Sequence, residues 1–131
     1  EMKSYTKLTY LGNEYNFELE TRPISKLFNT SNKFLVFGNQ TQEIATIIDP
    51  QWLRKIKIEI PNYGTFGMFP KMSFGENYDI KLNSDKIGEF REQYFAFTPR
   101  GYLDIDESQS NNFALVVSIL YRGLYNRMVS N

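Results

Sequence analysis

The chain contains neither cysteine nor histidine among its 131 residues. The absence of cysteine excludes disulfide bonds, thiolate metal ligation and a cysteine nucleophile. The absence of histidine removes the commonest metal ligand and the side chain that most often acts as a general base near neutral pH. Catalysis would depend on carboxylates, lysines and hydroxyls, which usually need a bound metal or strong burial at pH 7. We therefore expect a binding protein rather than an enzyme, with no cofactor and no metal.

Net charge and long apolar runs are also lacking. Fifteen basic residues balance fifteen acidic ones, so no global field attracts the chain to nucleic acid or to an anionic membrane. The longest apolar run, residues 113–120, is interrupted by Ser118 and is much shorter than the roughly 20 residues that cross a bilayer. The first residues have no apolar segment of the kind found in a secretory signal. The sequence predicts a cytoplasmic protein with no membrane partner.

Aromatic residues are abundant, with nine tyrosines, eleven phenylalanines and one tryptophan. Apolar residues make up 41% of the chain, which is enough for one ordinary core, so we expect residues 1–131 to form a single domain. Aromatic side chains are favoured in β-strands, and most of them are expected to fill a β core.

Period-two alternation and turn residues predict a mainly β (α+β) fold. The expected strands are 7–11 and 15–20 as a hairpin, 34–37 paired with 43–48, 55–60 with its isoleucines inward, 77–82, 92–98 and 102–105. For residues 111–129 the pattern suits a helix or a buried strand, and we favour a helix capped by Ser110 or Asn111. The predicted architecture is an antiparallel sheet or a small OB-like barrel with this one C-terminal helix.

The stretch 61–75 combines three glycines and two prolines with four aromatic residues and two methionines. Its glycines and prolines argue against a regular element, and its large apolar side chains argue against a solvated loop. Two interpretations remain open: the stretch folds back onto the core, or it presents apolar groups to a partner.

Carboxylates offer only weak metal-site patterns. The acidic run 104–107 is best explained as a solvated strand end, because no third ligand accompanies it. Asp49, Asp79 and Lys81 faintly resemble the acidic residues and lysine of metal-dependent nucleases. So short a pattern arises by chance in most chains of this length, and we favour the simpler explanation that Asp79 and Lys81 lie on an exposed strand face. A metal-dependent hydrolase is the third-ranked hypothesis.

Basic and aromatic residues lie together in two parts of the chain. Single-stranded nucleic acid is bound by this combination, because bases stack on aromatic rings while lysine and arginine neutralise phosphates. The predicted nucleic-acid-binding residues are Trp52, Arg54, Lys55, Lys57, Tyr63, Phe66, Phe69, Lys71, Tyr94, Phe97 and Arg100.

Four segments resemble the small YdcP-like proteins of Gram-positive integrative conjugative elements. Residues 5–12 are similar to the opening strand of that family, and residues 56–61 to an alternating strand that ends in isoleucine-proline. Residues 74–82 and 94–105 are similar to later strands. The resemblance implies an accessory role beside a helicase in DNA replication and transfer. The chain departs from the family pattern in the aromatic stretch after Pro61 and in the tail from Ser108.

Two hypotheses of different classes follow. The first is a non-catalytic, nucleic-acid-binding accessory protein of a mobile element or phage, which contacts DNA without sequence preference. The second is a protein-interaction module of phage or plasmid origin that docks on a host protein or on another copy of itself. Its expected anchors in the aromatic stretch are Tyr63, Phe66, Met68 and Phe69.

Overall fold

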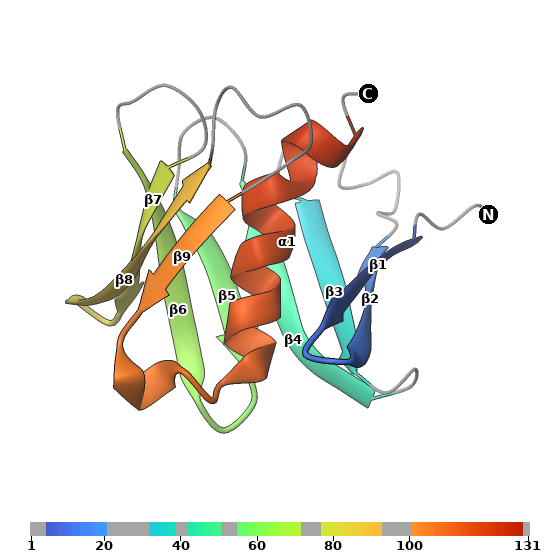
Figure 1. Ribbon diagram of the computed structural model, residues 1–131, viewed down its shortest axis with the longest axis horizontal. Coiled ribbons are helices and arrows are strands. Elements are labelled where there is room, and N and C mark those ends of the chain that lie inside the picture. Colours follow the sequence, from blue (N-terminus) through green and yellow to red (C-terminus); the bar gives the residue numbers. More distant parts are fainter. Residues whose placement is uncertain are drawn as a thin grey trace, which may run out of the picture.

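The computed structural model describes residues 5–20, 32–38, 42–50, 55–71, 77–92 and 101–129 (Figure 1). Nine strands form one sheet in which each strand is antiparallel to its neighbours in the sequence. They are β1 (Tyr5–Tyr10), β2 (Asn13–Leu19), β3 (Asn32–Gly38), β4 (Gln42–Asp49), β5 (Ile56–Ile60), β6 (Gly64–Pro70), β7 (Asn77–Leu82), β8 (Asp85–Glu92) and β9 (Gly101–Ile105). A short 3-10 helix, η2 (Glu107–Gln109), leads to the helix α1 (Phe113–Val129).

The predicted mainly β class, with an antiparallel sheet and one C-terminal helix, is confirmed. Of the two forms left open, the structure has the open sheet, since β1 and β9 are edge strands that do not pair with each other. The predicted hairpin corresponds to β1 and β2, and the predicted pair 34–37 and 43–48 to β3 and β4. In β5 the isoleucines are buried and Lys57 and Glu59 are exposed, as the alternation predicts.

The stretch expected to be irregular contains a regular strand. Residues 64–70 form β6, which is paired with β5 on one side and β7 on the other. Gly67 leaves room for a neighbouring ring, because a Cβ at this position would lie 2.7 Å from Cε1 of Phe69. Pro70 is the last residue of the strand, where the missing N–H does least harm to the ladder. The two residue types that argued against a strand therefore occupy positions where a strand tolerates them.

Strand β8 was not predicted. Phe90 is the one residue of β8 that is buried, so the strand lacks a clear apolar alternation. A Cβ at Gly88 would overlap the carbonyl oxygen of Asp104, so this position requires glycine. A glycine has no side chain to add to an apolar alternation, which makes the strand still harder to recognise. The predicted strand 92–98 starts where β8 ends, and its residues 93–98 lie outside the described residues.

Helix α1 fills the space inside the curled sheet (Figure 1). It contacts β3, β4 and β5 in the middle of the sheet and also β1, β8 and β9 near its two edges. Residues 115–119 and 121–123 are all buried. A helix that is buried on every side belongs inside a core. The predicted helix is confirmed, but its cap is Asn112, whose Oδ1 accepts a hydrogen bond from the Leu115 N–H (3.3 Å), rather than Ser110 or Asn111.

A buried ion pair joins α1 to the end of β4. Nε of Arg122 lies 2.7 Å from Oδ2 of Asp49, and the two side chains are only 9% and 7% exposed. The guanidinium also lies over the ring of Tyr78, 5.9 Å from its centroid. Both charges are shielded from solvent by the packed helix. Removal of either side chain would therefore leave the other charge buried without a counter-ion.

Gly123 permits the close approach of α1 to β8, since a Cβ at this position would overlap the ring of Phe90. We expect Gly123→Ala to lower the free energy of unfolding by about 1–3 kcal/mol through overpacking, measured by urea denaturation. The better helix propensity of alanine offsets part of this loss. Phe90→Leu in the same chain should recover part of the loss, and a simple gain in stability for Gly123→Ala would contradict the proposed contact.

Candidate functional site

The outer face of β5, β6 and β7 carries a row of basic residues centred on a glycine. Lys57 on β5 and Lys81 on β7 are both register partners of Gly67 on β6, so the three residues form one row across the sheet. Because alternate residues of a strand share a face, Lys55 and Phe69 lie on this same face. We call Lys55, Lys57, Gly67, Phe69 and Lys81 the lysine groove.

The groove is a shallow hollow of about 270 Å³, with Thr65 and Asn83 at its margin. The ring of Phe69 leans over Gly67. Its centroid lies 4.7 Å from Nζ of Lys81 and 5.5 Å from Nζ of Lys55, which is the range of cation–π contacts. The ring thus holds two ammonium groups over the sheet without neutralising them.

Ion pairing separates these lysines from the other lysines whose side chains are described. Lys7 pairs with Glu14 at 3.4 Å and Lys33 with Glu20 at 3.5 Å. Lys71 and Lys86 also pair with carboxylates. Across the described ranges, no ion pair is found for Lys55, Lys57 or Lys81. Within the described part of the chain, the three lysines without an ion pair therefore lie together in one groove, which concentrates positive charge on a chain whose net charge is zero.

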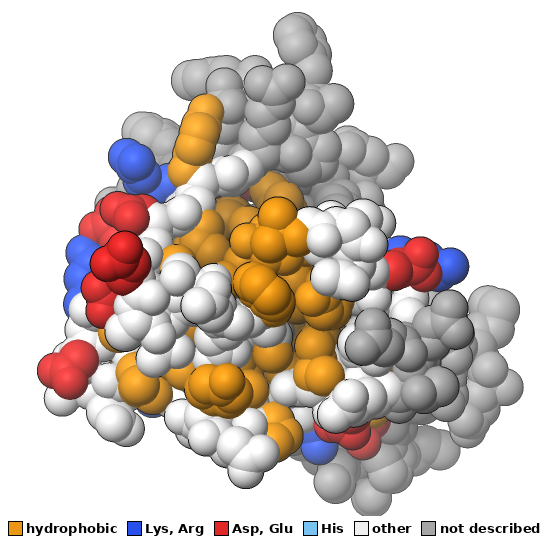
Figure 2. Space-filling model, turned by 60° about the horizontal axis from the view of Figure 1, so that its bottom comes forward, with side chains coloured by type: hydrophobic (Ala, Val, Ile, Leu, Met, Phe, Trp, Pro, Cys, Tyr) orange, Lys and Arg blue, Asp and Glu red, His pale blue; other side chains and the backbone are white. Residues whose placement is uncertain are grey.

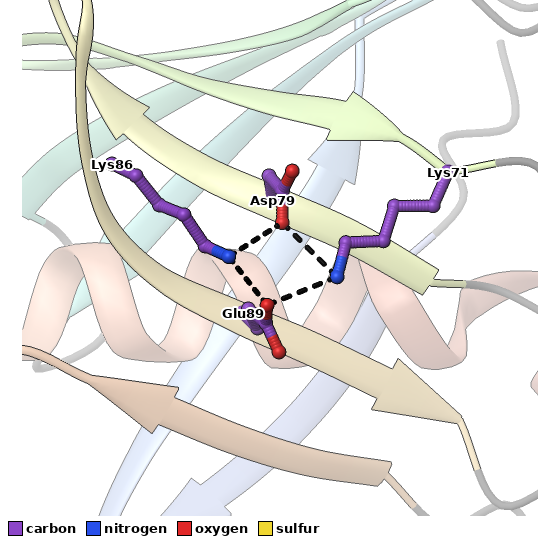
Figure 3. A network of polar contacts seen from close by, with 4 residues as sticks. All are labelled: Lys71, Asp79, Lys86 and Glu89. Atoms are coloured by element: carbon purple, nitrogen blue, oxygen red, sulfur yellow. Dashed lines mark hydrogen bonds and ion pairs between the residues drawn. The ribbon is translucent and has the colours of Figure 1, made fainter.

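A compact network of four side chains lies beside the groove (Figure 3): Lys71 directly after β6, Asp79 on β7, and Lys86 and Glu89 on β8. Nζ of Lys71 lies 3.2 Å from Oδ1 of Asp79 and 3.0 Å from Oε1 of Glu89. Nζ of Lys86 contacts the same two oxygen atoms. Two positive and two negative groups balance each other here, so the network adds no net charge to the lysine groove.

The network shifts the pKa values of its members. Hydrogen bonds from Lys86 and Lys71 lower the pKa of the Glu89 carboxyl from 4.5 to about 2. Partial burial opposes ionisation of Asp79, but its contacts with Lys71 and Lys86 leave the pKa of this carboxyl below its ordinary value. Contacts with Glu89, and then with Asp79, raise the pKa of both lysines. All four groups are therefore charged at neutral pH.

The structure separates the predicted nucleic-acid-binding residues. It brings Lys55, Lys57 and Phe69 together in the groove. Phe66 lies in the core at 1% exposure, which removes it from any contact surface, and Tyr63 lies in the turn between β5 and β6. Lys71 belongs to the balanced network rather than to the groove. The remaining members of the predicted set lie outside the described residues: Trp52, Arg54, Tyr94, Phe97 and Arg100.

Lys81 was not among the predicted binding residues. It had been grouped with Asp49 and Asp79 as part of a nuclease-like pattern. Asp49 is buried against α1, whereas Asp79 and Lys81 lie on the outer face of β7, so the three residues do not form one site. The alternation of β7, which places Lys81 outward beside Gly67, is the signal that could have found it.

No group of three or more acidic side chains is placed to hold a metal ion among the described residues, and this includes the acidic run 104–107. None of the described helices combines the length and the apolar character needed to span a bilayer.

By fold and site, the chain belongs to the class of open antiparallel β-sheet proteins wrapped around a helix, with a cationic groove on the outer face. No protein-family model matches it, and comparisons with curated proteins and with solved structures find no match either.

The depressed pKa of Glu89 predicts a defined pH dependence of stability. Because the folded value is below the unfolded one, ionised Glu89 stabilises the fold above pH 4.5, and this contribution is lost as the pH falls towards about 2. We expect Glu89→Gln to be less stable than the wild type at pH 7, with the difference shrinking through that window. Urea midpoints measured across the pH range test this, and a difference that stays constant down to pH 2 would contradict it.

Proposed function

We propose that this protein is a non-catalytic binding protein for nucleic acid and that the lysine groove is its contact surface. The observation that carries the proposal is the gathering of the three unpaired lysines around Gly67 and Phe69. Several ammonium groups on one surface patch raise the local positive potential, which attracts a polyanion.

The spacing of the lysines allows the groove to contact more than one phosphate. Neighbouring strands lie about 4.8 Å apart, so the backbones of Lys57 and Lys81 are about 10 Å apart across Gly67. Lys55 lies two residues from Lys57, about 7 Å along β5. Lysine is a flexible point charge with no preferred base partner here, which favours binding that does not depend on sequence.

Phe69 favours a single strand over a duplex. Its ring is only partly buried and forms the wall of the groove. An unpaired base can stack on such a ring, while the two ammonium groups now near it turn towards the phosphates on either side. In a duplex the base faces are already stacked on one another and cannot reach the ring. The ligand proposed is therefore single-stranded nucleic acid.

The neutral chain predicts modest, salt-sensitive binding. Without a global positive charge, affinity depends on a few local contacts and falls as salt screens them. The resemblance of residues 5–12 and 56–61 to the YdcP-like proteins favours DNA as the ligand and an accessory role in a mobile element or phage. Strand transfer and replication expose single-stranded DNA, which fits the groove as described.

Lysine substitution in the groove tests the proposal. We expect Lys57→Gln with Lys81→Gln to weaken binding of a fluorescently labelled single-stranded oligonucleotide by about tenfold or more at about 50 mM salt. The slope of log K against log salt should fall by about 1.4, because each phosphate contact to a single strand contributes about 0.7.

The matched control is Lys7→Gln with Lys33→Gln, which removes the same charge from two lysines that are already paired. Its affinity should stay within about twofold of the wild type. Equal losses in the two double variants, or no anisotropy change for the wild type at about 10 μM protein and about 50 mM salt, would rule out the groove as the binding surface.

Substitution of Phe69 tests the stacking contact separately from charge. Phe69→Leu should weaken single-strand binding by about 1–3 kcal/mol while leaving the salt slope unchanged, because no phosphate contact is lost. Duplex binding should change little. The comparison uses the same anisotropy titration, and a loss that is equal for the two oligonucleotides would contradict a stacking role.

A further inference from the structure

Leu11 occupies a backbone conformation that its side chain does not favour. It lies with Gly12 in the two-residue turn between β1 and β2, and both residues have positive φ values, 50° and 79°. This is the signature of a type I′ turn, which strongly prefers asparagine, aspartate or glycine at the first position. The left-handed region is uncommon for a residue with a branched apolar side chain.

The other left-handed residues follow the usual preference. Besides Leu11, the non-glycine residues with positive φ in the described ranges are Asn62 and Asn83, both in turns. Leu11 is also 69% exposed, more than any other large hydrophobic residue described. Asparagine or glycine would be more favourable for the fold at this position. The stability of the monomer therefore does not explain the leucine, and an interaction outside the folded monomer does.

Leu11 belongs to an apolar surface at the end of the molecule where α1 begins. The ring of Tyr10 meets that of Phe113 edge to face, with centroids 6.0 Å apart. Phe113 is 38% exposed and Tyr63, in the β5–β6 turn, is 59% exposed. We call Tyr10, Leu11, Ile44, Tyr63 and Phe113 the apolar end. Figure 2 shows hydrophobic side chains gathered in the centre of this face, with charged ones at its margins.

The same surface contains hollows of about side-chain size. One, of about 280 Å³, is lined by Tyr15, Ile44, Phe113 and Ala114 together with polar groups. A second, of about 270 Å³, shares the wall formed by Ile44, Phe113 and Ala114 and extends to Tyr63. A projecting leucine thus lies on the same face as hollows that could receive it.

The chemistry of the rim suits a partner with an identical surface. Apart from Glu43 and the buried Asn112, which caps α1, the polar side chains around the two hollows are uncharged amides: Asn13, Gln42, Asn62 and Asn111. A face with strong charge of one sign would repel its own copy, whereas amides both donate and accept hydrogen bonds and can pair with themselves. A projection and a receiving hollow on one uncharged surface are what a two-fold symmetric contact requires.

We propose that the apolar end is a self-association surface, on which Leu11 of each copy inserts into the hollow beside Ile44 and Phe113 of the other. The partner is therefore a second copy of this chain, related by two-fold symmetry. The lysine groove lies on the outer face of β5–β7 and contributes no residue to this contact, so each proposal can fail without the other.

Leu11→Asn separates an interface role from a structural role. Asparagine is preferred in this turn, so the melting temperature of the dilute variant should equal or exceed that of the wild type. Sedimentation velocity between about 1 and about 500 μM should show a concentration-dependent dimer for the wild type. The dimer dissociation constant should rise at least tenfold in Leu11→Asn.

Tyr102→Asn provides a control, since Tyr102 is 58% exposed on β9 and lies outside the apolar end. Its dimer dissociation constant should match that of the wild type. The proposal is overturned if the wild type stays monomeric over the whole range or if Leu11→Asn associates as strongly as the wild type. A dilute Leu11→Asn protein that melts several degrees lower would also overturn it, because Leu11 would then serve the fold.

Discussion

The enclosure of α1 by the curled sheet is the constraint on which the rest of the structure depends. The helix is buried at almost every position from 115 to 123, so the sheet must bend around it and the strands must present their apolar side chains inward. The stacked rings of Phe17 and Tyr121, with centroids 3.9 Å apart, and the ion pair between Asp49 and Arg122 fix its position. Because the helix covers the inner face, the sheet surfaces that remain open to solvent are the outer face and the ends of the strands.

Charges on the outer face fall into two groups, the balanced four-residue network and the lysine groove. Asp79 on β7 and Glu89 on β8 balance Lys71 and Lys86. A single lysine added to or removed from such a network changes stability modestly, because its members are partly exposed to water. Lys57 and Lys81 flank Gly67 instead. The ring of Phe69 attracts the ammonium groups of Lys81 and Lys55 without cancelling their charge. A chain with no net charge can in this way keep a local positive surface.

Alternation in the sequence was sufficient to predict most strands and the helix, and it failed where backbone geometry decides. Strand β5 was predicted because Ile56, Ile58 and Ile60 share one buried face. Strand β6 was missed because the role of Gly67 depends on a ring two residues away, and β8 was missed because its close approach at Gly88 depends on a strand that follows it in the sequence. The burial of Phe66 and the ion pairs of Lys71 likewise depend on how β6 pairs with its neighbouring strands.

For the site, the sequence identified the residue types but not their partners. Lys55, Lys57 and Phe69 were predicted and do lie together. Lys81 joins them only when β6 and β7 pair in the observed register, since it is separated from Gly67 by 14 positions in the chain, 81 minus 67. Whether a lysine forms an ion pair depends likewise on the residues that face it from neighbouring strands. The amino-acid composition does not reveal those neighbours.

The order of elements along the chain has a consequence for biosynthesis. All nine strands precede the helix that fills their inner face, and each strand pairs with its immediate predecessor. Hairpins can form one after another as the polypeptide leaves the ribosome, but the apolar interior has no filling until α1 has emerged. A chain that lacks α1 therefore exposes the apolar inner face of the sheet, and exposed surface of this kind promotes aggregation.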